Sequence, residues 1–167
     1  MAVFDLKNAV ITIQDGTTSP LSITAKIGDG NLTFSEKTII EYKKDRGLLD
    51  TARLGDQEPM DVKIEFNWIF LKGDTGDYAA NPNVQNTSLR DALTKTGGAA
   101  AWVSSDKNDP CAPYCVDIIV LYTPCVGKTE TITLKYFRKE DMSFDAKAGT
   151  ISVSGKCNVQ SPTIVRT

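Results

Sequence analysis

The sequence predicts a single, mainly β domain: a β-sandwich with one short helix and one long protruding hairpin loop. Three observations support this fold class. The 167 residues suit one domain spanning residues 1–167, and 41% of them are hydrophobic, which is enough for a core without metals or disulfides. Short alternating or β-branched runs, bounded by Gly, Pro and Asp, recur along most of the chain. Only one segment carries a convincing helix pattern.

Three strands are expected near the start of the chain. The run from Ala9 to Ile13 is rich in β-branched residues and is followed by turn-forming Asp, Gly, Ser and Pro. The run from Leu21 to Ile27 alternates and ends at the turn cluster Gly28-Asp29-Gly30. From Leu32 to Tyr42 the chain begins with alternating apolar and polar residues, which predicts a third strand.

The clearest strand signal runs from Met60 to Phe70. Because side chains alternate between the two faces of a strand, one face is expected in the core and the other outside it. The expected core face consists of Val62, Ile64, Phe66, Trp68 and Phe70, and the polar face of Asp61, Lys63, Glu65 and Asn67. A mixed polar face of this kind either meets water or lines a polar channel when subunits join their sheets into a large barrel.

One helix is expected from Ser88 to Thr96. Ser88 can cap its start, with Asp91 three residues on in capping-box register, and Gly97-Gly98 stops it. Its apolar face consists of Leu89, Ala92 and Leu93. A helix of this length is too short to be stable alone, so it must pack on a sheet.

The chain closes with three strands that are expected to form an antiparallel meander. They run from Val116 to Thr123, from Thr129 to Phe137 and from Thr150 to Cys157, with a turn at Asp145 to Gly149. In this meander Thr129 pairs back toward Thr123, and Cys157 arrives beside Thr129.

Two long connections interrupt the strands. The segment from Lys43 to Pro59 is highly charged, and connections beyond about 12–15 residues are uncommon and often functional. Apolar residues among its charges suggest a contact made on assembly, so we expect disorder in the monomer and order in the assembled particle. The candidate assembly residues are Lys44, Arg46, Leu48, Leu49, Asp50, Arg53 and Leu54. A second connection, Gly73 to Thr87, is rich in Gly, Asn and Asp and leads into the helix.

The four cysteines are spaced C-x3-C-x9-C-x31-C. A four-cysteine zinc site usually has two tight pairs, and this spacing has one. The expected meander places Cys157 beside the turn that holds Cys125 and leaves Cys111 and Cys115 as neighbours at the opposite end. Three alternatives stay open: disulfides between Cys125 and Cys157 and between Cys111 and Cys115, formed after the chain leaves the cell; plain buried thiols; or a bound metal, which the spacing disfavours.

The composition excludes several function classes. The chain has no His, which removes Ser-His-Asp triads, Cys-His dyads and His-ligated zinc, so no catalytic residue, cofactor site or metal site is assigned. The net charge of −2 argues against nucleic-acid binding through a broad basic surface. No apolar run approaches the roughly 20 residues of a membrane span, and the N-terminus lacks a signal-peptide pattern. We therefore expect synthesis in the cytoplasm and no membrane partner.

The order of these segments resembles that of bacteriophage tail tube (major tail) proteins. The early strand pair reads Asn8-Ala9-Val10-Ile11-Thr12-Ile13 and Leu21-Ser22-Ile23. The second hairpin has the arms Asn31 to Tyr42 and Pro59 to Phe70, joined by the loop with Asp50-Thr51-Ala52 and Gly55-Asp56. The helix follows, and the chain closes with Gly149-Thr150-Ile151-Ser152-Val153-Ser154-Gly155-Lys156-Cys157-Asn158, which is similar to the terminal strand of many tail tube proteins. The C-x3-C pair is not part of the general family pattern.

The resemblance implies a β-sandwich whose subunits form hexameric rings that stack into a tube, with DNA passing through the lumen. Each subunit would contribute strands to a large inner barrel, and the long hairpin loop would reach a neighbouring subunit or ring. Family lumens are generally acidic or neutral, because Lys and Arg bind phosphates tightly and a conduit must not. The candidate lumen residues are Thr33, Ser35, Asp61, Glu65 and Asn67. The implied partners are further copies of the chain, the tape measure, terminator and baseplate proteins, and DNA in transit, all in a phage tail.

Two rival functions remain. The chain could be another virion β-protein, such as a tail terminator, a head-decoration protein or a baseplate hub component. A small enzyme or metal-binding module is the other class, and the missing His and the lack of a nucleophile–base pair count against it.

Overall fold

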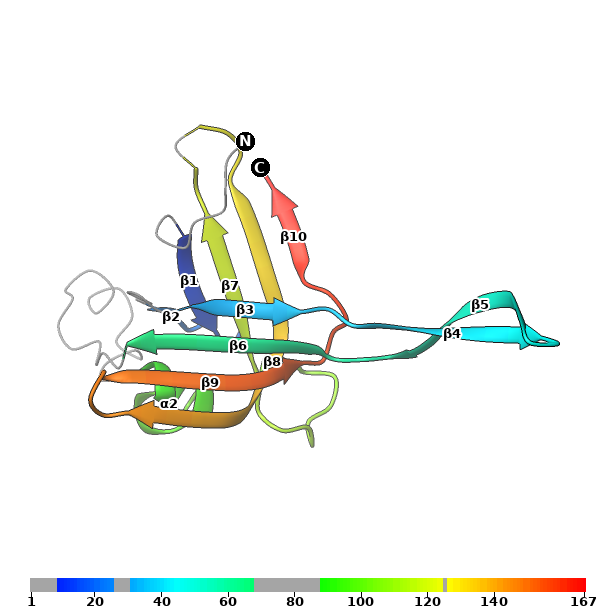
Figure 1. Ribbon diagram of the computed structural model, residues 1–167. Helices are drawn as coiled ribbons and strands as arrows, with labels where there is room; N and C mark the ends of the chain where they lie inside the picture. Colours follow the sequence, from blue (N-terminus) through cyan, green and yellow to red (C-terminus); the bar gives the residue numbers. More distant parts are fainter. Residues whose placement is uncertain (1–8, 26–30, 68–87, 125) are drawn as a thin grey trace.

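The computed structural model describes residues 9–25, 31–67, 88–124 and 126–167, which form a bent antiparallel sheet and a projecting two-stranded ribbon (Figure 1). The strands are β1 (Ala9–Gln14), β2 (Ser22–Ala25), β3 (Leu32–Ser35), β4 (Thr38–Asp45), β5 (Leu48–Gln57), β6 (Met60–Asn67), β7 (Val116–Tyr122), β8 (Glu130–Asp145), β9 (Thr150–Cys157) and β10 (Thr163–Arg166). The helix α2 (Leu89–Thr94) and the 3-10 turn η3 (Gly97–Ala99) follow β6 in the chain. The mainly β fold class with one short helix is confirmed.

The large sheet folds over on itself through β8. Its strand order is β2-β1-β7-β8-β9-β6-β3, and β10 also pairs with β8. The first half of β8 pairs with β7 and β10, and the second half pairs with β9. In Figure 1, β3, β6 and β9 run across β1, β7 and the start of β8, so the two halves of the sheet face each other as the layers of a sandwich.

The bend in β8 lies at a β-bulge. The pairing of β7 with β8 shifts register between Val116 and Ile118, and Tyr136 in the bulge has a positive φ of 59°. The Tyr136 N–H donates to Asp117 Oδ1 at 3.0 Å, which supplies a partner for a backbone group that leaves the ladder. We expected this strand to end at Phe137, but it continues through a charged segment to Asp145 because the bend carries it into the second layer.

Gly155 allows β9 to approach β8 at a second irregularity. The β8–β9 register shifts between Lys139 and Asp141, close to the pairing of Gly155 with Lys139. A Cβ atom on Gly155 would lie 2.0 Å from the carbonyl oxygen of Arg138. Any side chain there would therefore force the two strands apart.

The core lies between the two layers. Val62, Ile64 and Phe66 of β6 are buried as expected, whereas Trp68 and Phe70 lie outside the described residues. The opposite layer contributes Ile11, Ile13, Ile118 and Val120. Helix α2 contacts β2 and β8 and adds three further core residues, Leu89, Ala92 and Leu93. Trp102, which follows η3, is also buried.

The helix has the predicted cap. The Asp91 N–H donates to Ser88 Oγ and the Ser88 N–H donates to Asp91 Oδ2, both at 3.2 Å, which is a capping box. The helix ends at Lys95, whose φ of 55° is left-handed, and η3 follows where a plain stop was expected. Among the described residues, no helix is both long and apolar enough to cross a membrane.

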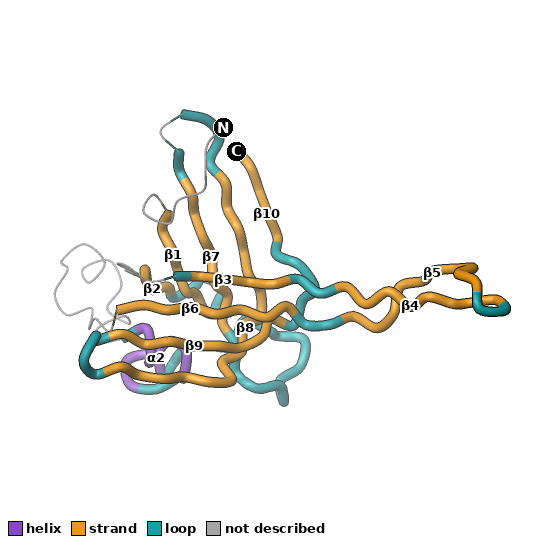
Figure 2. The backbone as a smooth tube through the Cα atoms, in the orientation of Figure 1, coloured by secondary structure: helices purple, strands orange, loops and turns teal. Residues whose placement is uncertain are grey.

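In the expected loop from Lys43 to Pro59, most residues instead belong to a two-stranded β-ribbon whose pairing shifts register at two places (Figure 2). The expected single strand from Leu32 to Tyr42 breaks after Ser35, so β3 stays in the large sheet and β4 enters the ribbon. β4 and β5 pair along their length and are joined by Arg46 and Gly47, with φ of 49° and 84°. Two positive φ values are the geometry of a type I′ hairpin turn, whose twist matches the flanking strands. The predicted protruding hairpin is therefore confirmed, and its arms are paired strands where a loop was expected. That this segment is disordered in the monomer and ordered on assembly stays a prediction.

Candidate assembly surfaces

A polar surface covers the layer formed by β3, β6, β9 and the second half of β8. Cross-strand pairing aligns Ser35 with Asp61 and Thr33 with Lys63, and residues that pair directly share a face of the sheet. The same rows continue onto β9, where Lys156 pairs with Asp61 and Ser154 pairs with Lys63. We call this surface the polar face; it comprises Thr33, Ser35, Asp61, Lys63, Glu65, Asn67, Arg138, Asp141, Ser143, Asp145, Thr150, Ser152, Ser154 and Lys156.

All five candidate lumen residues lie on the polar face. Thr33, Ser35, Asp61 and Glu65 are exposed and Asn67 is half-buried. Sequence reasoning missed the part contributed by β9 and the extension of β8. The signal on β9 was available, because Ser152 and Ser154 alternate with the buried Ile151 and Val153. That the polar face lines a lumen remains a prediction.

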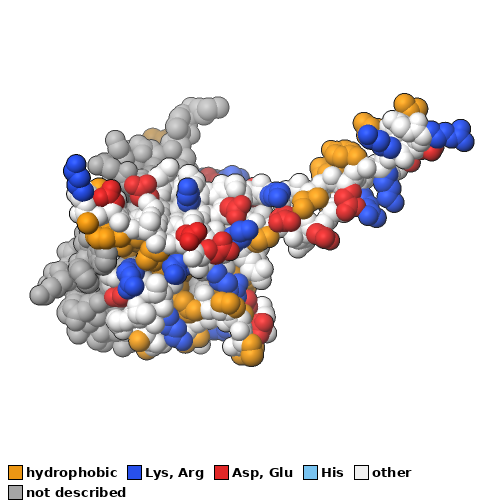
Figure 3. All heavy atoms as spheres, turned by 60° about the horizontal axis from the view of Figure 1, so that its bottom comes forward, with side chains coloured by type: hydrophobic (Ala, Val, Ile, Leu, Met, Phe, Trp, Pro, Cys, Tyr) orange, Lys and Arg blue, Asp and Glu red, His pale blue; other side chains and the backbone are white. Residues whose placement is uncertain are grey.

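The charges of the polar face are mixed in sign, and Figure 3 shows acidic and basic side chains interspersed over this side of the molecule. Lys156 Nζ lies 3.8 Å from Asp61 Oδ1, and both side chains are about half exposed, so this ion pair contributes little stability. A surface of hydroxyls and balanced charges does not bind a polyanion strongly, because the contacts that neutralise phosphates are offset by nearby carboxylates.

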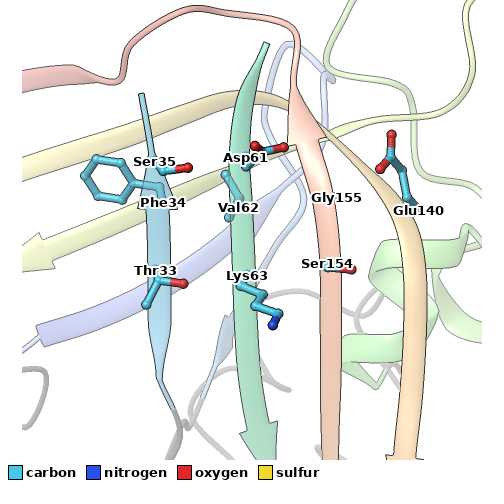
Figure 4. A pocket seen from close by; sticks show the side chains of 9 residues that line it. All are labelled: Thr33, Phe34, Ser35, Asp61, Val62, Lys63, Glu140, Ser154 and Gly155. Carbon is cyan, nitrogen blue, oxygen red and sulfur yellow. The ribbon is translucent and has the colours of Figure 1, made fainter. Parts of the chain in front are cut away.

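A groove of about 330 Å³ crosses the polar face between β3 and β8 (Figure 4). It is lined by Thr33, Phe34, Ser35, Asp61, Val62, Lys63, Glu140, Ser154 and Gly155. A second groove of about 240 Å³ shares Thr33 and Lys63 with it. The titratable groups that line the two grooves are exposed to solvent. No cluster of metal-ligating side chains occurs in the part of the chain that the structure describes.

The layer that carries the polar face has two open borders. At β3, Asn31 and Glu65 exchange backbone hydrogen bonds of 3.2 and 2.7 Å, so the alternation of an antiparallel ladder directs the N–H groups of Leu32 and Phe34 away from β6. At β8, pairing with β7 stops at Phe137, and among the described strands only β9 pairs with the segment from Lys139 to Ser143. Unpaired borders of this kind are templates for pairing with another chain.

The ribbon of β4 and β5 carries every candidate assembly residue. These residues, Lys44, Arg46, Leu48, Leu49, Asp50, Arg53 and Leu54, are all exposed. Figure 1 shows the ribbon projecting away from both layers. The register pairs Ile40 with Leu54, Tyr42 with Ala52 and Lys44 with Leu49 on one face. Glu41 and Arg53 form an ion pair on the other face.

The apolar residues on the first of these faces form what we call the ribbon apolar face: Ile40, Tyr42, Leu49, Ala52 and Leu54. Leu49 and Leu54 are 73% and 76% exposed. Hydrophobic side chains are visible along the ribbon in Figure 3. Exposed leucines at this density indicate a surface that is covered by another molecule.

The cysteines do not occupy the expected positions. Cys157 pairs with Phe137, which in turn pairs with Val116, so Cys157 lies near the start of β7 and not beside Thr129. The extension of β8 to Asp145 causes this difference and removes the geometric reason for a bridge to Cys125, which lies outside the described residues. Cys111 and Cys115 are also free thiols.

The two buried thiols have different surroundings. Cys115 Sγ lies 3.2 Å from Ser104 Oγ and 3.3 Å from the backbone nitrogen of Asp106. Burial raises the pKa of Cys157 to about 12, with smaller contributions from Asp117 and Cys115. At neutral pH the Cys157 thiol is therefore protonated, and it is a poor nucleophile for disulfide exchange.

We expect alkylation of the native chain at pH 7 to separate the thiols. Cys111 is exposed and should react as a free thiol, whereas Cys115 and Cys157 should react at least about 1000-fold more slowly because they become accessible only on unfolding. Peptide mapping after timed labelling measures each rate. A fast reaction at Cys157, or recovery of a Cys111–Cys115 bridge, would contradict the placement of these residues.

Neither a protein-family model nor a curated protein sequence matches the chain. Solved structures do share its fold. A chain of the PVC sheath/tube terminator of an extracellular contractile injection system, in the extended state, aligns with a TM-score of 0.55 and 11% identity, over 99% of this chain and 98% of that chain. A chain of the PVC sheath-tube complex aligns with a TM-score of 0.51 and 10% identity, over 99% and 93%. A chain of the anti-feeding prophage baseplate aligns with a TM-score of 0.39 and 10% identity, over 99% and 97%.

The first two alignments cover almost the whole chain, so the fold is that of proteins from contractile injection tails. The expected tail-tube-like architecture is confirmed at the level of the fold.

Proposed function

We propose that the chain is a structural subunit of a phage-like tail that assembles with copies of itself into stacked rings forming the tail tube. The observation that carries this proposal is the layer of β3, β6, β9 and β8, which has a polar outer face and two borders, at β3 and at Lys139 to Ser143 of β8, that no further described strand covers. When such layers join edge to edge around a ring, they close into a barrel without free edges, and their polar faces line its interior. The ring size of six follows from the family resemblance.

The polar face suits a conduit. Its carboxylates are Asp61, Glu65, Asp141 and Asp145, and its cations are Lys63, Lys156 and Arg138, of which Arg138 is paired with Asp106. A lumen built from this face therefore does not bind a passing polyanion strongly. DNA is the proposed cargo, and its passage is transient and non-specific. The proposed partners at the ends of the tube are tape measure, terminator and baseplate proteins, and the proposed location is the virion.

A tail terminator is the second candidate. The alignment with a chain of the PVC sheath/tube terminator, at a TM-score of 0.55, favours it about as strongly as the alignment with the sheath-tube complex favours a tube subunit. A terminator closes one ring and does not stack, so particle length separates the two functions. We propose no enzymatic activity, because the chain has no His and its described grooves hold no nucleophile–base pair.

Electron microscopy of the purified chain at rising concentration, with Phe34→Pro and Phe34→Ala variants, tests the proposal. Proline removes the outward Phe34 N–H without breaking the β3–β6 ladder, and alanine removes the same side chain while keeping that N–H. We expect tubes for the unchanged chain, and for Phe34→Pro an assembly concentration at least about tenfold above that of Phe34→Ala.

Each outcome has a distinct meaning. Discrete single rings from the unchanged chain would favour the terminator over the tube subunit. A chain that stays monomeric at all concentrations would contradict self-assembly. Equal assembly by the two variants, with equal thermal stability, would contradict edge-to-edge joining through β3.

A further inference from the structure

The exposed face of the other layer differs sharply from the polar face. On β1, β7, β8 and β10 the register aligns two cross-strand rows, which we call the uncharged face: Val10, Leu121, Thr131 and Val165 in one row, and Thr12, Ile119, Thr133 and Thr163 in the other. None of these side chains carries a charge, and Val10, Leu121 and Val165 are 46%, 39% and 49% exposed. A patch that spans four strands without a charge has the composition of an interface core.

The ribbon apolar face is the second unpartnered surface of the chain. The ribbon extends from β3 and β6, which belong to the polar layer, and it points away from the sandwich (Figure 1). The uncharged face lies on the other layer. The ribbon of one chain therefore cannot fold back onto the uncharged face of the same chain, and each surface requires a different molecule.

We propose that the ribbon apolar face of one copy docks on the uncharged face of a second copy. This inference rests on the proposed self-assembly and names the surfaces that make one of its contacts. Both surfaces belong to the same chain, so every copy offers one donor ribbon and one acceptor sheet. A contact of this heterologous kind propagates into a ring or a helical stack.

The dimensions of the two surfaces agree. The 10 residues of β5 span about 33 Å at about 3.3 Å per residue. Four strands spaced about 4.8 Å apart cover about 15 Å between the outer two. The ribbon is therefore long enough to cross all four strands of the second copy while it stays connected to β3 and β6 of its own chain.

The distribution of charges on the ribbon is also compatible with docking of its apolar face. Glu41, Lys43 and Arg53 lie on the opposite side of the ribbon, so they remain in water when the apolar side docks. Lys44 shares the apolar side near the tip, where its long side chain can keep the ammonium group at the rim. Docking on the uncharged face therefore leaves Glu41, Lys43 and Arg53 in water, and it avoids the cost of desolvating the charged groups of the polar face.

Disulfide trapping tests the contact in a Cys111→Ser, Cys125→Ser background. Protein carrying Leu54→Cys is mixed with protein carrying Leu121→Cys under mild oxidation, and the matched control replaces the second partner by Thr33→Cys on the polar face. We expect covalent dimers from the first mixture at a rate at least about tenfold above the control. Equal trapping at Thr33→Cys, or none at Leu121→Cys, would overturn the proposal.

A charge-pair experiment provides a second measurement. Leu54→Lys and Leu121→Glu should each raise the assembly concentration about tenfold, because each buries an unpaired charge in the contact. The double variant, with both changes in every chain, should assemble within about threefold of the unchanged protein, because the two charges then meet between copies. A double variant as defective as the two single changes combined would contradict the proposal.

The experiments distinguish failure of the ribbon contact from failure of the proposed tube function. Tubes or rings without Leu54–Leu121 trapping would overturn this contact and leave the proposed function standing. Trapping by a protein that forms neither tubes nor rings would support the contact and overturn the tube proposal.

Discussion

Replacing residues 41–53 by a two-residue Asn-Gly turn should yield a folded chain that no longer assembles. Ile40 pairs directly with Leu54, so a two-residue turn between them keeps the base of the hairpin in register. The removed residues are all exposed, and no core residue lies among them. We expect the free energy of unfolding to change by less than about 1 kcal/mol, while polymers disappear at concentrations at which the unchanged chain assembles.

Denaturant unfolding and sedimentation velocity measure the two effects. The matched control replaces Glu41 and Arg53 by glutamines, which removes the ion pair of the exposed ribbon and leaves its apolar side intact. That variant should assemble normally, because exposed ion pairs contribute little. Normal polymers from the shortened chain would refute a role for the ribbon in assembly.

Asp15→Ala should lower the free energy of unfolding by about 3–4 kcal/mol, because it removes the acceptor of several buried hydrogen bonds. Asp15 is a buried carboxylate, 2% exposed, at the end of β1. Its Oδ1 accepts hydrogen bonds from the N–H of Leu21 at 2.8 Å and from the hydroxyl of Thr17 at 2.8 Å. Its Oδ2 accepts from the N–H of Val103 at 3.1 Å. Alanine would leave the N–H groups of Leu21 and Val103 without acceptors and would release the segment next to the buried Trp102.

Chemical denaturation of Asp15→Ala, Asp15→Asn and Asp109→Ala separates the cause from a general loss of charge. Asparagine keeps one acceptor oxygen, so it should cost less than alanine. Asp109 accepts from the N–H of Cys111 at 2.9 Å on the exposed surface, so its loss should cost less than about 1 kcal/mol. Equal losses for Asp15→Ala and Asp109→Ala would show that the buried hydrogen bonds of Asp15 do not stabilise the fold.

Local sequence patterns were sufficient to predict those elements whose structure depends mainly on residues within the element itself. The alternation of Val62, Ile64 and Phe66 with polar residues predicted both the strand and its buried face, because a one-residue slip would move every apolar side chain into water. The pair Ser88 and Asp91 predicted the start of the helix, because a capping box is completed within four residues. The turn-bounded strand signals likewise predicted a mainly β fold.

The ribbon was missed although its turn was visible in the sequence. Arg46-Gly47 adopts the two positive φ values of a type I′ turn, but Arg is not a residue that usually signals such a turn. The charges of β4 and β5 suggested a loop because strands are usually recognised by a buried face, and this ribbon has none within its own chain.

Pairing between distant strands was decided by the tertiary structure alone. The bulge at Tyr136 carries β8 from one layer to the other, and this placed Cys157 opposite Phe137 and gave the polar layer its open border. Such a bend depends on how the two layers pack and on the close approach of β9 to Arg138 at Gly155, where an added Cβ atom would lie 2.0 Å from the Arg138 carbonyl oxygen. Neither condition can be predicted from the local alternation of residues. The same pairing assembled the polar face and the uncharged face from strands far apart in the chain, since residues that share a face need only the same register and no sequence signal in common.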